Sequence, residues 1–222
     1  MNFSKETFDF LIENRLQNSK EWFNGHKEQY NKYVIAPLVS LTERLAPVLL
    51  DIDPALNCSP KVGGAISRIW RDVRFSKDKS LFRDSMWLSF VRRKAEGLPE
   101  FFFVVSPECL MYGAGYYMTP ADSMRSIREL IINGDAEFKA AKAAFDNQSI
   151  FRLDGDMYGK SKHPDAPEEL KAWLDRKTIC FIRESGDFDL LYSDKLFCTL
   201  AESYRILAPV YRFLIKAEEI KN

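Results

Sequence analysis

The sequence predicts an α+β fold in which helices from the N-terminal, middle and C-terminal parts of the chain pack on a mainly antiparallel sheet. Three observations support this prediction. Residues 4–50 place apolar side chains at helical spacing, residues 62–118 contain short β-like runs, and residues 119–220 return mostly to helical spacing. The short connections between the β-like runs favour antiparallel pairing over crossovers through helices.

Length and composition predict a single domain over residues 1–222. A chain of 222 residues is within the size that one core serves, and 46% of its residues are hydrophobic. The sequence contains no repeat, low-complexity tract or linker that would divide it. One core is therefore expected to serve the whole chain.

The N-terminal part shows the signals of helix starts. Ser4 is a suitable N-cap for a first helix, and Asn18 with Glu21 resembles a capping box that opens a second one. Pro37 suits the first turn of a third helix. Residues 4–50 are therefore predicted to be helical.

The rest of the chain alternates between the two periodicities. Strands are predicted at 65–70, 86–92, 101–105, 109–118 and 178–183. Helices are predicted at 119–133, 136–145, near 167–174 and over 194–220. Pro209 lies inside the last of these and is expected to kink or split it.

Two glycines interrupt the run CLMYGAGYYM at residues 109–118. Gly113 and Gly115 weaken a strand that otherwise pairs well, which indicates either a bulge or the close approach of another backbone or a ligand. The run lacks the GxGxxG spacing and the following helix of a phosphate-binding motif.

Basic residues concentrate in one window of a chain that is neutral overall. Lys plus Arg and Asp plus Glu each number 32, so there is no global basic surface for nucleic acid or anionic membrane. Between Lys61 and Lys94, ten basic residues face three acidic ones, which makes the window +7 and the remainder −7. The basic ones are Lys61, Arg68, Arg71, Arg74, Lys77, Lys79, Arg83, Arg92, Arg93 and Lys94.

The centre of this window, RIWRDVRFSKDKSLFR at residues 68–83, is the candidate functional site. Guanidinium groups bind carboxylate or phosphate bidentately and lysines add mobile charges, so the stretch suits a small phosphate- or carboxylate-bearing ligand. Strand alternation would place Arg68 and Arg71 on opposite faces, so the chain must curl to form a pocket. The expected ligand-binding residues are Arg68, Arg71, Arg74, Lys77, Lys79, Arg83 and Tyr116.

Two aspartates lie among these cations. Asp72 and Asp78 are candidates to orient the cations or, in an enzyme, to act as acid or base. If the protein is an enzyme, electrostatic stabilisation of developing negative charge is the mechanism that this equipment supports. The competing interpretation is a network of internal ion pairs that ties a loop to the sheet.

Two further functions remain open for the basic stretch. Its surface would dock on an acidic partner, or on the acidic region of another copy, in an interaction or scaffold protein. A single-stranded nucleic-acid binder is the third alternative, because Trp70, Phe75, Phe82 and Trp87 interleave with the charges. The neutral total argues against nucleic acid.

Metal and cofactor chemistry have little support. His26 and His163 are the only histidines, and neither has a neighbouring ligand at zinc-site spacing. His26 is expected to pack on its helix. His163 lies with Lys160 and Lys162 in a polar loop, where it could join an anion site or act as a general acid or base. No metal and no cofactor are expected.

The thiols and the N-terminus favour a soluble cytoplasmic protein. The four cysteines are scattered without a CxxC pair and lie mostly in apolar surroundings, which predicts buried thiols in a reducing compartment. The N-terminal MNFSKETFDFL lacks the apolar core of a signal peptide, and apolar runs fall short of the ~20 residues that span a bilayer. No membrane association is expected, and the oligomeric state stays open.

The chain resembles the uncharacterised family catalogued as domain of unknown function 2461. The resemblance is carried by EWF with Tyr30 and Pro37, RIWRDVRFSKDKSLFR, GAGYY followed by Pro120, IREL, and HPDAPEELKAWLDRK. These pieces occur in the family's order over almost the whole chain. The family usually carries Pro-Tyr-Lys where this sequence has Leu81-Phe82-Arg83, which keeps the charge and loses a hydroxyl. The resemblance implies that the basic block is a signature of the group, and it supplies no reaction, substrate or cofactor.

Overall fold

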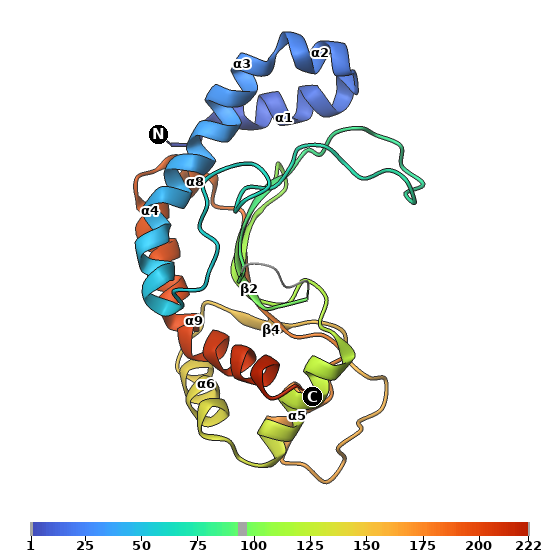
Figure 1. Ribbon diagram of the computed structural model, residues 1–222, viewed down its shortest axis with the longest axis vertical. Coiled ribbons are helices and arrows are strands. Elements are labelled where there is room, and N and C mark those ends of the chain that lie inside the picture. The colour runs from blue at the N-terminus through green and yellow to red at the C-terminus, as the bar shows by residue number, and fades with distance from the viewer. Residues whose placement is uncertain (1, 93–96, 222) are drawn as a thin grey trace. The chain divides into compact units, whose positions relative to one another are not determined.

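The fold is α+β, as the sequence predicts. A computed structural model of the chain describes residues 2–92 and 97–221 (Figure 1). About 49% of the chain is helical and 16% is in strands, and the strands form one antiparallel sheet. Arg93 and Lys94, which contribute to the basic window, lie outside the described residues.

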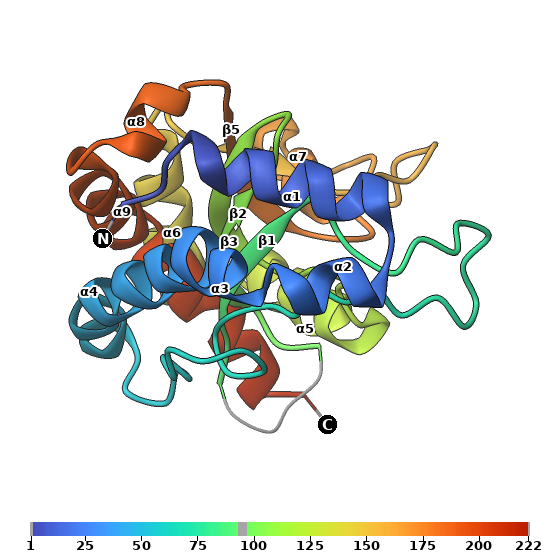
Figure 2. The same cartoon turned by 90° about the horizontal axis from the view of Figure 1, so that it is seen from above.

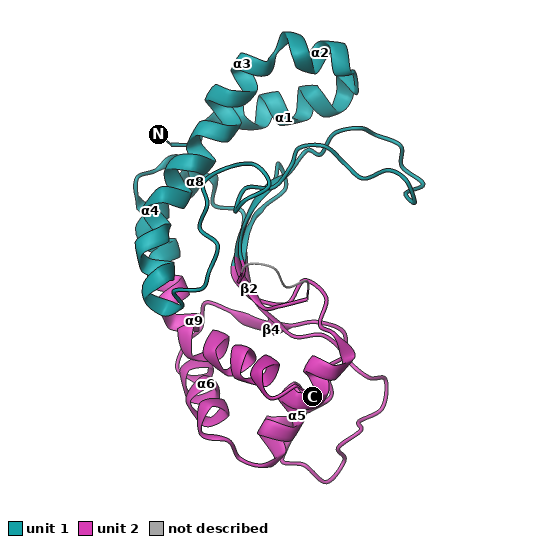
Figure 3. Cartoon of the chain, in the orientation of Figure 1, with its two compact units in different colours: residues 1–90, 102–112, 184–201 teal, residues 91–101, 113–183, 202–222 magenta. Residues whose placement is uncertain are grey.

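The chain divides into two compact units (Figure 3). Unit 1 comprises residues 1–90, 102–112 and 184–201, and unit 2 comprises residues 91–101, 113–183 and 202–222. Some strands and the last helix contribute residues to both units. The single domain over 1–222 therefore stays a prediction.

The N-terminal part of unit 1 is helical throughout. Its elements are α1 (Lys5–Gln17), α2 (Lys20–Gly25), α3 (Lys27–Tyr30), the π-helical turn η1 (Asn31–Ile35) and α4 (Ala36–Ile52). Ser4 is the N-cap of α1, and its backbone N–H donates to Thr7 Oγ1 at 3.2 Å. The capping box at Asn18 is wrong, because Asn18 ends α1 in the left-handed conformation and Ser19 caps α2 through the Trp22 N–H.

Within the described residues, one helical stretch is long and apolar enough to span a membrane. It covers residues 27–52, although the apolar runs of the sequence led us to expect no stretch of this length. Its side chains Leu38, Leu45 and Leu49 are fully buried inside the protein. A core helix meets the same length and composition criterion, so the structure is compatible with a soluble protein.

In the described part of the chain, five strands form one sheet in the order β1-β2-β3-β5-β4. They are β1 (Met86–Phe90), β2 (Glu100–Val105), β3 (Leu110–Gly115), β4 (Arg152–Asp154) and β5 (Cys180–Ser185). The predicted strand at 65–70 is wrong. That segment makes only isolated bridges, from Ile66 to Leu88 and from Trp70 to Phe82.

All but one of the remaining helices agree with the predicted helical segments. They are α5 (Ala121–Ile132), α6 (Ala136–Asp146), α7 (Glu168–Leu174), α8 (Phe188–Tyr192) and α9 (Lys195–Glu219). Pro209 does not split α9, which continues as one helix through it. The sequence analysis missed β4 and α8, both of which are short.

The two glycines of β3 allow the neighbouring strand to come close. A Cβ atom at Gly113 would overlap the carbonyl oxygen of Phe181 in β5. One at Gly115, whose φ is 142°, would lie 2.6 Å from the Cα of Cys180. Of the open alternatives, the approach of another backbone is therefore the one observed.

The thiols are less buried than predicted. Cys198 is exposed, and Cys58, Cys109 and Cys180 are half-buried. Burial raises the pKa of the Cys180 thiol to about 12, so this thiol stays protonated at neutral pH.

Candidate functional site

The basic stretch forms a closed loop that projects from unit 1 (Figure 2). We call residues 68–83 the basic loop. Its two ends pair as a short antiparallel ladder, in which the Arg71 N–H donates to the Leu81 carbonyl at 2.8 Å and the Arg83 N–H to the Ile69 carbonyl at 2.9 Å. The chain therefore turns between these ends, as the curled loop expected from the sequence requires.

Aromatic packing fixes the base of the basic loop to α2. Phe82 is fully buried, and its ring centroid lies 5.2 Å from that of Phe23 and 4.4 Å from that of Trp70. Phe23 also makes an edge contact with Trp70 at 5.5 Å. Phe23 and Phe82 are buried in the core and are not free as a stacking surface for bases, whereas Trp70 is 38% exposed.

One carboxylate joins the basic loop to α1. Asp78 Oδ2 accepts hydrogen bonds from Arg71 and, at 2.8 Å, from Arg15 of α1. Asp78 Oδ1 accepts from the hydroxyl and the backbone N–H of Ser80. The Ser80 hydrogen bonds, followed by Arg71, lower the pKa of Asp78 below the usual carboxyl range.

Arg15 is a member of this site that the sequence did not lead us to expect. Its guanidinium also donates to the Phe82 carbonyl at 2.8 Å. Nearby, the side chain of Asn18 accepts from the Leu81 N–H at 2.6 Å. Arg15 and Asp78 are 63 positions apart in the sequence, and no local pattern connects them. Helix α1 thus holds the basic loop at two points.

Most of the other loop cations also have partners inside the loop. Arg74 pairs with Asp72 at 2.6 Å, and this hydrogen bond lowers the pKa of Asp72 to about 2. Lys79 donates to the Val73 carbonyl at 2.9 Å, and the Arg83 guanidinium lies 4.8 Å from the centre of the Trp87 ring. These contacts favour the internal ion-pair network over an open pocket.

Two of the predicted ligand-binding cations, Lys77 and Arg68, form none of the ion pairs described above. Lys77 is exposed and has no ion-pair partner among residues 2–92 and 97–221, and the exposed Arg68 lies beside Gly63. Asp72 and Asp78 both act in ion pairs, so an orienting role fits the geometry. A catalytic role for either aspartate stays a prediction.

The middle of the basic loop carries an exposed aromatic side chain. Phe75 is 96% exposed, the highest value among the exposed large hydrophobic residues. It lies between Arg74, whose guanidinium is 5.9 Å from the Phe75 ring centre, and Lys77. We call residues 74–77 the loop tip. Phe75 is thus an exposed apolar side chain with a cation on either side of it in the sequence.

Tyr116 and His163 belong to unit 2, apart from the basic loop in the division of the chain. The buried Tyr116 hydroxyl donates to Glu218 at 2.6 Å, and burial together with Glu218 raises its pKa. His163 is half-buried in the loop that follows β4. Their ligand-binding and acid–base roles stay predictions. His26, as expected, packs on its helix, with its ring stacked on Trp22 at 4.0 Å.

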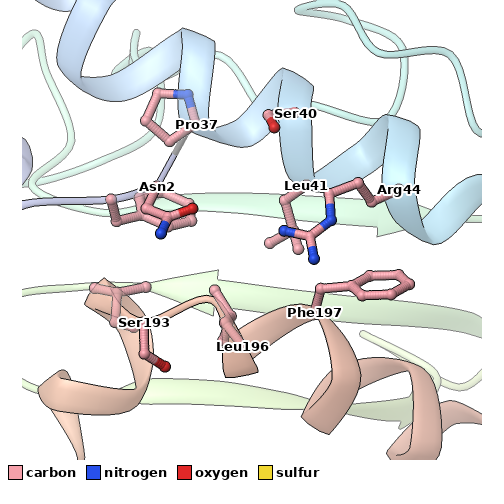
Figure 4. A pocket seen from close by; sticks show the side chains of 10 residues that line it. Asn2, Pro37, Ser40, Leu41, Arg44, Ser193, Leu196 and Phe197 are labelled. Atoms are coloured by element: carbon pink, nitrogen blue, oxygen red, sulfur yellow. The ribbon is translucent and has the colours of Figure 1, made fainter.

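Two hollows in unit 1 lie away from the basic loop. A groove of about 360 Å³ is lined by Glu6, Asp9, Phe10, Glu13, Trp22, Gln29 and Tyr33, and we call it the acidic groove. A cavity of about 10 Å³, large enough for about one water, lies between α4 and the residues around Leu196 (Figure 4). At its edge the Arg44 guanidinium lies 4.4 Å from the Phe197 ring centre. Among the described residues, no group of three or more His, Cys, Asp or Glu side chains could hold a metal ion.

The fold and the site define an α+β protein with a projecting basic loop that is tied to its first helix by a shared carboxylate. The sequence profile of a family described as conserved hypothetical protein (DUF2461) matches residues 6–213. The chain belongs to this family, as the resemblance of the basic block suggests. No curated protein matches the chain.

Proposed function

We propose that the protein is an interaction protein that docks on an acidic protein surface through its basic loop. The observation that carries this proposal is the exposure of Phe75 between Arg74 and Lys77 at the loop tip. Burying a Phe side chain in a partner contributes about 1.5–3 kcal/mol, and the flanking cations select a negatively charged surface.

The contrast between the fixed base of the basic loop and its exposed tip supports docking. Arg15 and Arg71 are held by Asp78, and Phe82 is buried against Phe23, so the base of the loop keeps one shape. At the tip, Phe75 and Lys77 are exposed, while Arg74 pairs with Asp72. A fixed base with an exposed tip lowers the entropy lost on binding.

The chain itself carries a surface of the required chemistry. The acidic groove has three carboxylates from α1, those of Glu6, Asp9 and Glu13, and three aromatic side chains, those of Phe10, Trp22 and Tyr33. Lys32, whose Nζ lies 4.8 Å from the Tyr33 ring centre, and Lys5 both attract Glu6, so three carboxylates outnumber the two cations beside them. We therefore name a second copy of this chain as the first partner, with the loop tip of one copy in the acidic groove of the other.

Sedimentation velocity at several protein and salt concentrations tests this proposal. The average mass is expected to rise with protein concentration at low salt and to fall as salt increases, because exposed charges are screened. Phe75→Ser and Lys77→Glu should each abolish the association. Tyr117→Ser is the matched control, because Tyr117 is 91% exposed and lies in unit 2. A wild-type chain that stays monomeric at every concentration and salt would overturn the proposal.

A mixing experiment identifies the two surfaces separately. The loop variant Phe75→Ser/Lys77→Glu keeps an intact groove, and the groove variant Asp9→Lys/Glu13→Lys keeps an intact loop. Each is expected to be monomeric alone, and the mixture to form a one-to-one dimer through the remaining intact pair of surfaces. Head-to-tail contacts of this kind are heterologous, so the wild-type chain is free to form longer assemblies. A mixture that stays monomeric would exclude the groove as the acceptor of the loop.

Binding of a small phosphate- or carboxylate-bearing ligand is a second candidate for the basic loop. It is favoured by the two guanidinium groups, from Arg15 and Arg71, that meet at one oxygen of the half-exposed Asp78. An external oxyanion would compete with Asp78 for them. Melting temperatures with phosphates, nucleotides, sugar phosphates and carboxylates test it, since a ligand at ~100 times its dissociation constant adds roughly 2.7 kcal/mol. A shift that Arg71→Ala leaves unchanged would exclude this site.

The proposal assigns the protein to the cytoplasm and assigns it no reaction. The four free thiols support a reducing compartment. Single-stranded nucleic acid remains the least favoured partner, because Phe82 is core and the chain is neutral overall. A mobility shift with a single-stranded oligonucleotide that Phe75→Ser abolishes would reverse that order.

A further inference from the structure

Three cations surround one tyrosine ring in unit 2. The Arg128 guanidinium lies 5.5 Å from the centre of the Tyr158 ring, and the Nζ atoms of Lys162 and Lys177 each lie 5.6 Å from it. We call these four residues the Tyr158 cluster. Each of the three charged groups thus lies within 5.6 Å of the same ring centre.

No carboxylate in the described part of the chain balances these charges. Neither Lys162 nor Lys177 forms an ion pair among residues 2–92 and 97–221. The Arg128 guanidinium donates two hydrogen bonds to backbone carbonyls, to that of Leu174 at 2.9 Å and to that of Arg176 at 2.5 Å. The Tyr158 ring attracts each cation, but it carries no net charge and leaves their mutual repulsion in place.

The backbone holds the cluster together. The Tyr158 N–H donates to the Asp175 carbonyl at 2.9 Å, and the Lys177 N–H donates to the Asp156 carbonyl at 2.6 Å. The buried Asp175 directs its Oδ1 to the backbone N–H of Lys162 at 2.8 Å. Asp175 thus holds the loop that carries Lys162 through the backbone N–H of that residue.

Three separate segments supply the cations. Arg128 comes from α5, Lys162 from the loop after β4, and Lys177 from the turn before β5. Arg176, next to Lys177, donates to the carbonyls of Ala172, Gly155 and Leu153. These hydrogen bonds hold the turn that carries Lys177 against α7 and β4. The cations meet because several elements of unit 2 fold around Tyr158, and local sequence does not bring them together.

We propose that the Tyr158 cluster is a binding site for a phosphate group of a small-molecule ligand. A phosphate dianion offers more negative charge than one carboxylate, and its several oxygens accept from one guanidinium and two ammonium groups at once. Arg128 is half-buried and gives the site a fixed donor, while the exposed lysines add mobile charges that close on the ligand. The site lies within unit 2 and does not rest on the proposed docking function.

Isothermal titration of the full-length protein with inorganic phosphate and with pyrophosphate tests the site. Measurements at ~0.15 M chloride suppress weak attraction to exposed charges. Saturable binding of one phosphate or pyrophosphate per chain is expected, with an affinity at least about tenfold lower in Lys162→Ala and in Lys177→Ala, since each removes one charge-assisted contact. Both side chains are exposed, so these variants are expected to fold.

A matched control keeps the result specific. Lys139→Ala removes an exposed lysine elsewhere in unit 2 and should leave the phosphate affinity unchanged. A wild-type protein without saturable binding of either anion would overturn the proposal. Equal affinity in wild type, Lys162→Ala and Lys177→Ala would overturn it as well, because the phosphate would then be bound elsewhere.

Discussion

The basic loop and the Tyr158 cluster are both rich in cations, and they differ in how the charge is balanced. In the basic loop, Asp78 holds Arg15 and Arg71 while Asp72 holds Arg74. In the Tyr158 cluster, three cations share one ring without a carboxylate partner among the described residues. The density of charge in the sequence therefore does not show where charge is left uncompensated.

The comparison changes the meaning of the basic block. The number of charges in its sequence indicates a pocket for an anion. The ion pairs in the structure instead hold the base of the loop in place and leave its tip exposed. The less conspicuous stretch around Lys162 and Lys177 keeps charge available for a ligand. An anion binds more favourably to cations that lack carboxylate partners, because no internal ion pair has to break before the anion binds.

The largest expected effect comes from removing the aromatic anchor of the basic loop. Phe82→Ala should lower the free energy of unfolding by about 3–5 kcal/mol, because a fully buried ring against Phe23 and Trp70 is replaced by a cavity. Chemical denaturation measures this loss. Phe75→Ala is the control, with no loss expected, because that ring is exposed. Equal losses in the two variants would show that the tip is packed in solution.

Charge reversal should act with opposite sign in the two clusters. Arg71→Glu places a carboxylate next to Asp78 and should lower the melting temperature. Lys177→Glu removes repulsion in the Tyr158 cluster and adds a partner for Lys162, so it should raise stability by about 0.5 kcal/mol. Denaturant midpoints for both variants decide the comparison. A destabilised Lys177→Glu would mean that the cations of the Tyr158 cluster already have a partner.

Acid should weaken the ion pair between Asp78 of the basic loop and Arg15 of α1. The folded-state pKa of Asp78 is lowered, so its contribution to stability is complete above the unfolded carboxyl pKa of about 3.9 and is lost as pH falls through the lower folded value. Asp78→Asn should therefore be less stable than wild type at neutral pH and approach it in strong acid. Melting temperatures of both proteins from pH 7 to pH 2 test this. A gap that does not narrow would assign the effect to a contact independent of charge.

The smallest effect is expected at the outer ion pair of the basic loop. Asp72 and Arg74 are both largely exposed, so Asp72→Ala should leave the melting temperature unchanged within measurement error. Asp78→Ala, measured in parallel, should lower it. If Asp72→Ala were the more destabilising of the two, the assignment of Asp78 as the anchor would be wrong.

The fold prediction is accurate for elements that depend on residues close together in the sequence, and it fails for elements that depend on distant residues. Helices α1, α5 and α6 are visible in the sequence, because their apolar spacing and caps are local. The predicted strand at 65–70 fails, because its alternating pattern finds only isolated bridges. Strand β4 has three residues and helix α8 has five, too few for a periodic signal.

The site prediction divides in the same way. The position of the basic loop and its candidate residues are readable from the sequence, since they are contiguous. The contact of Arg15 with the basic loop, and the membership of Arg128 and Lys177 in the Tyr158 cluster, cannot be read from the sequence, because each of these residues comes from a distant segment. The grouping of His163 with Lys160 and Lys162 located one part of the second cluster without its other two cations.

The sequence by itself determined the α+β class, the helical N-terminal part, the basic loop and the resemblance to the family. These properties rest on composition, on periodicity and on contiguous residues. Only the tertiary structure decided which cations are paired, that Phe75 is exposed while Phe82 is buried, and that three cations meet at Tyr158. The physical reason is that Coulomb attraction and burial depend on distances of a few ångströms in space, which residues such as Arg15 and Asp78 reach only after the chain has folded.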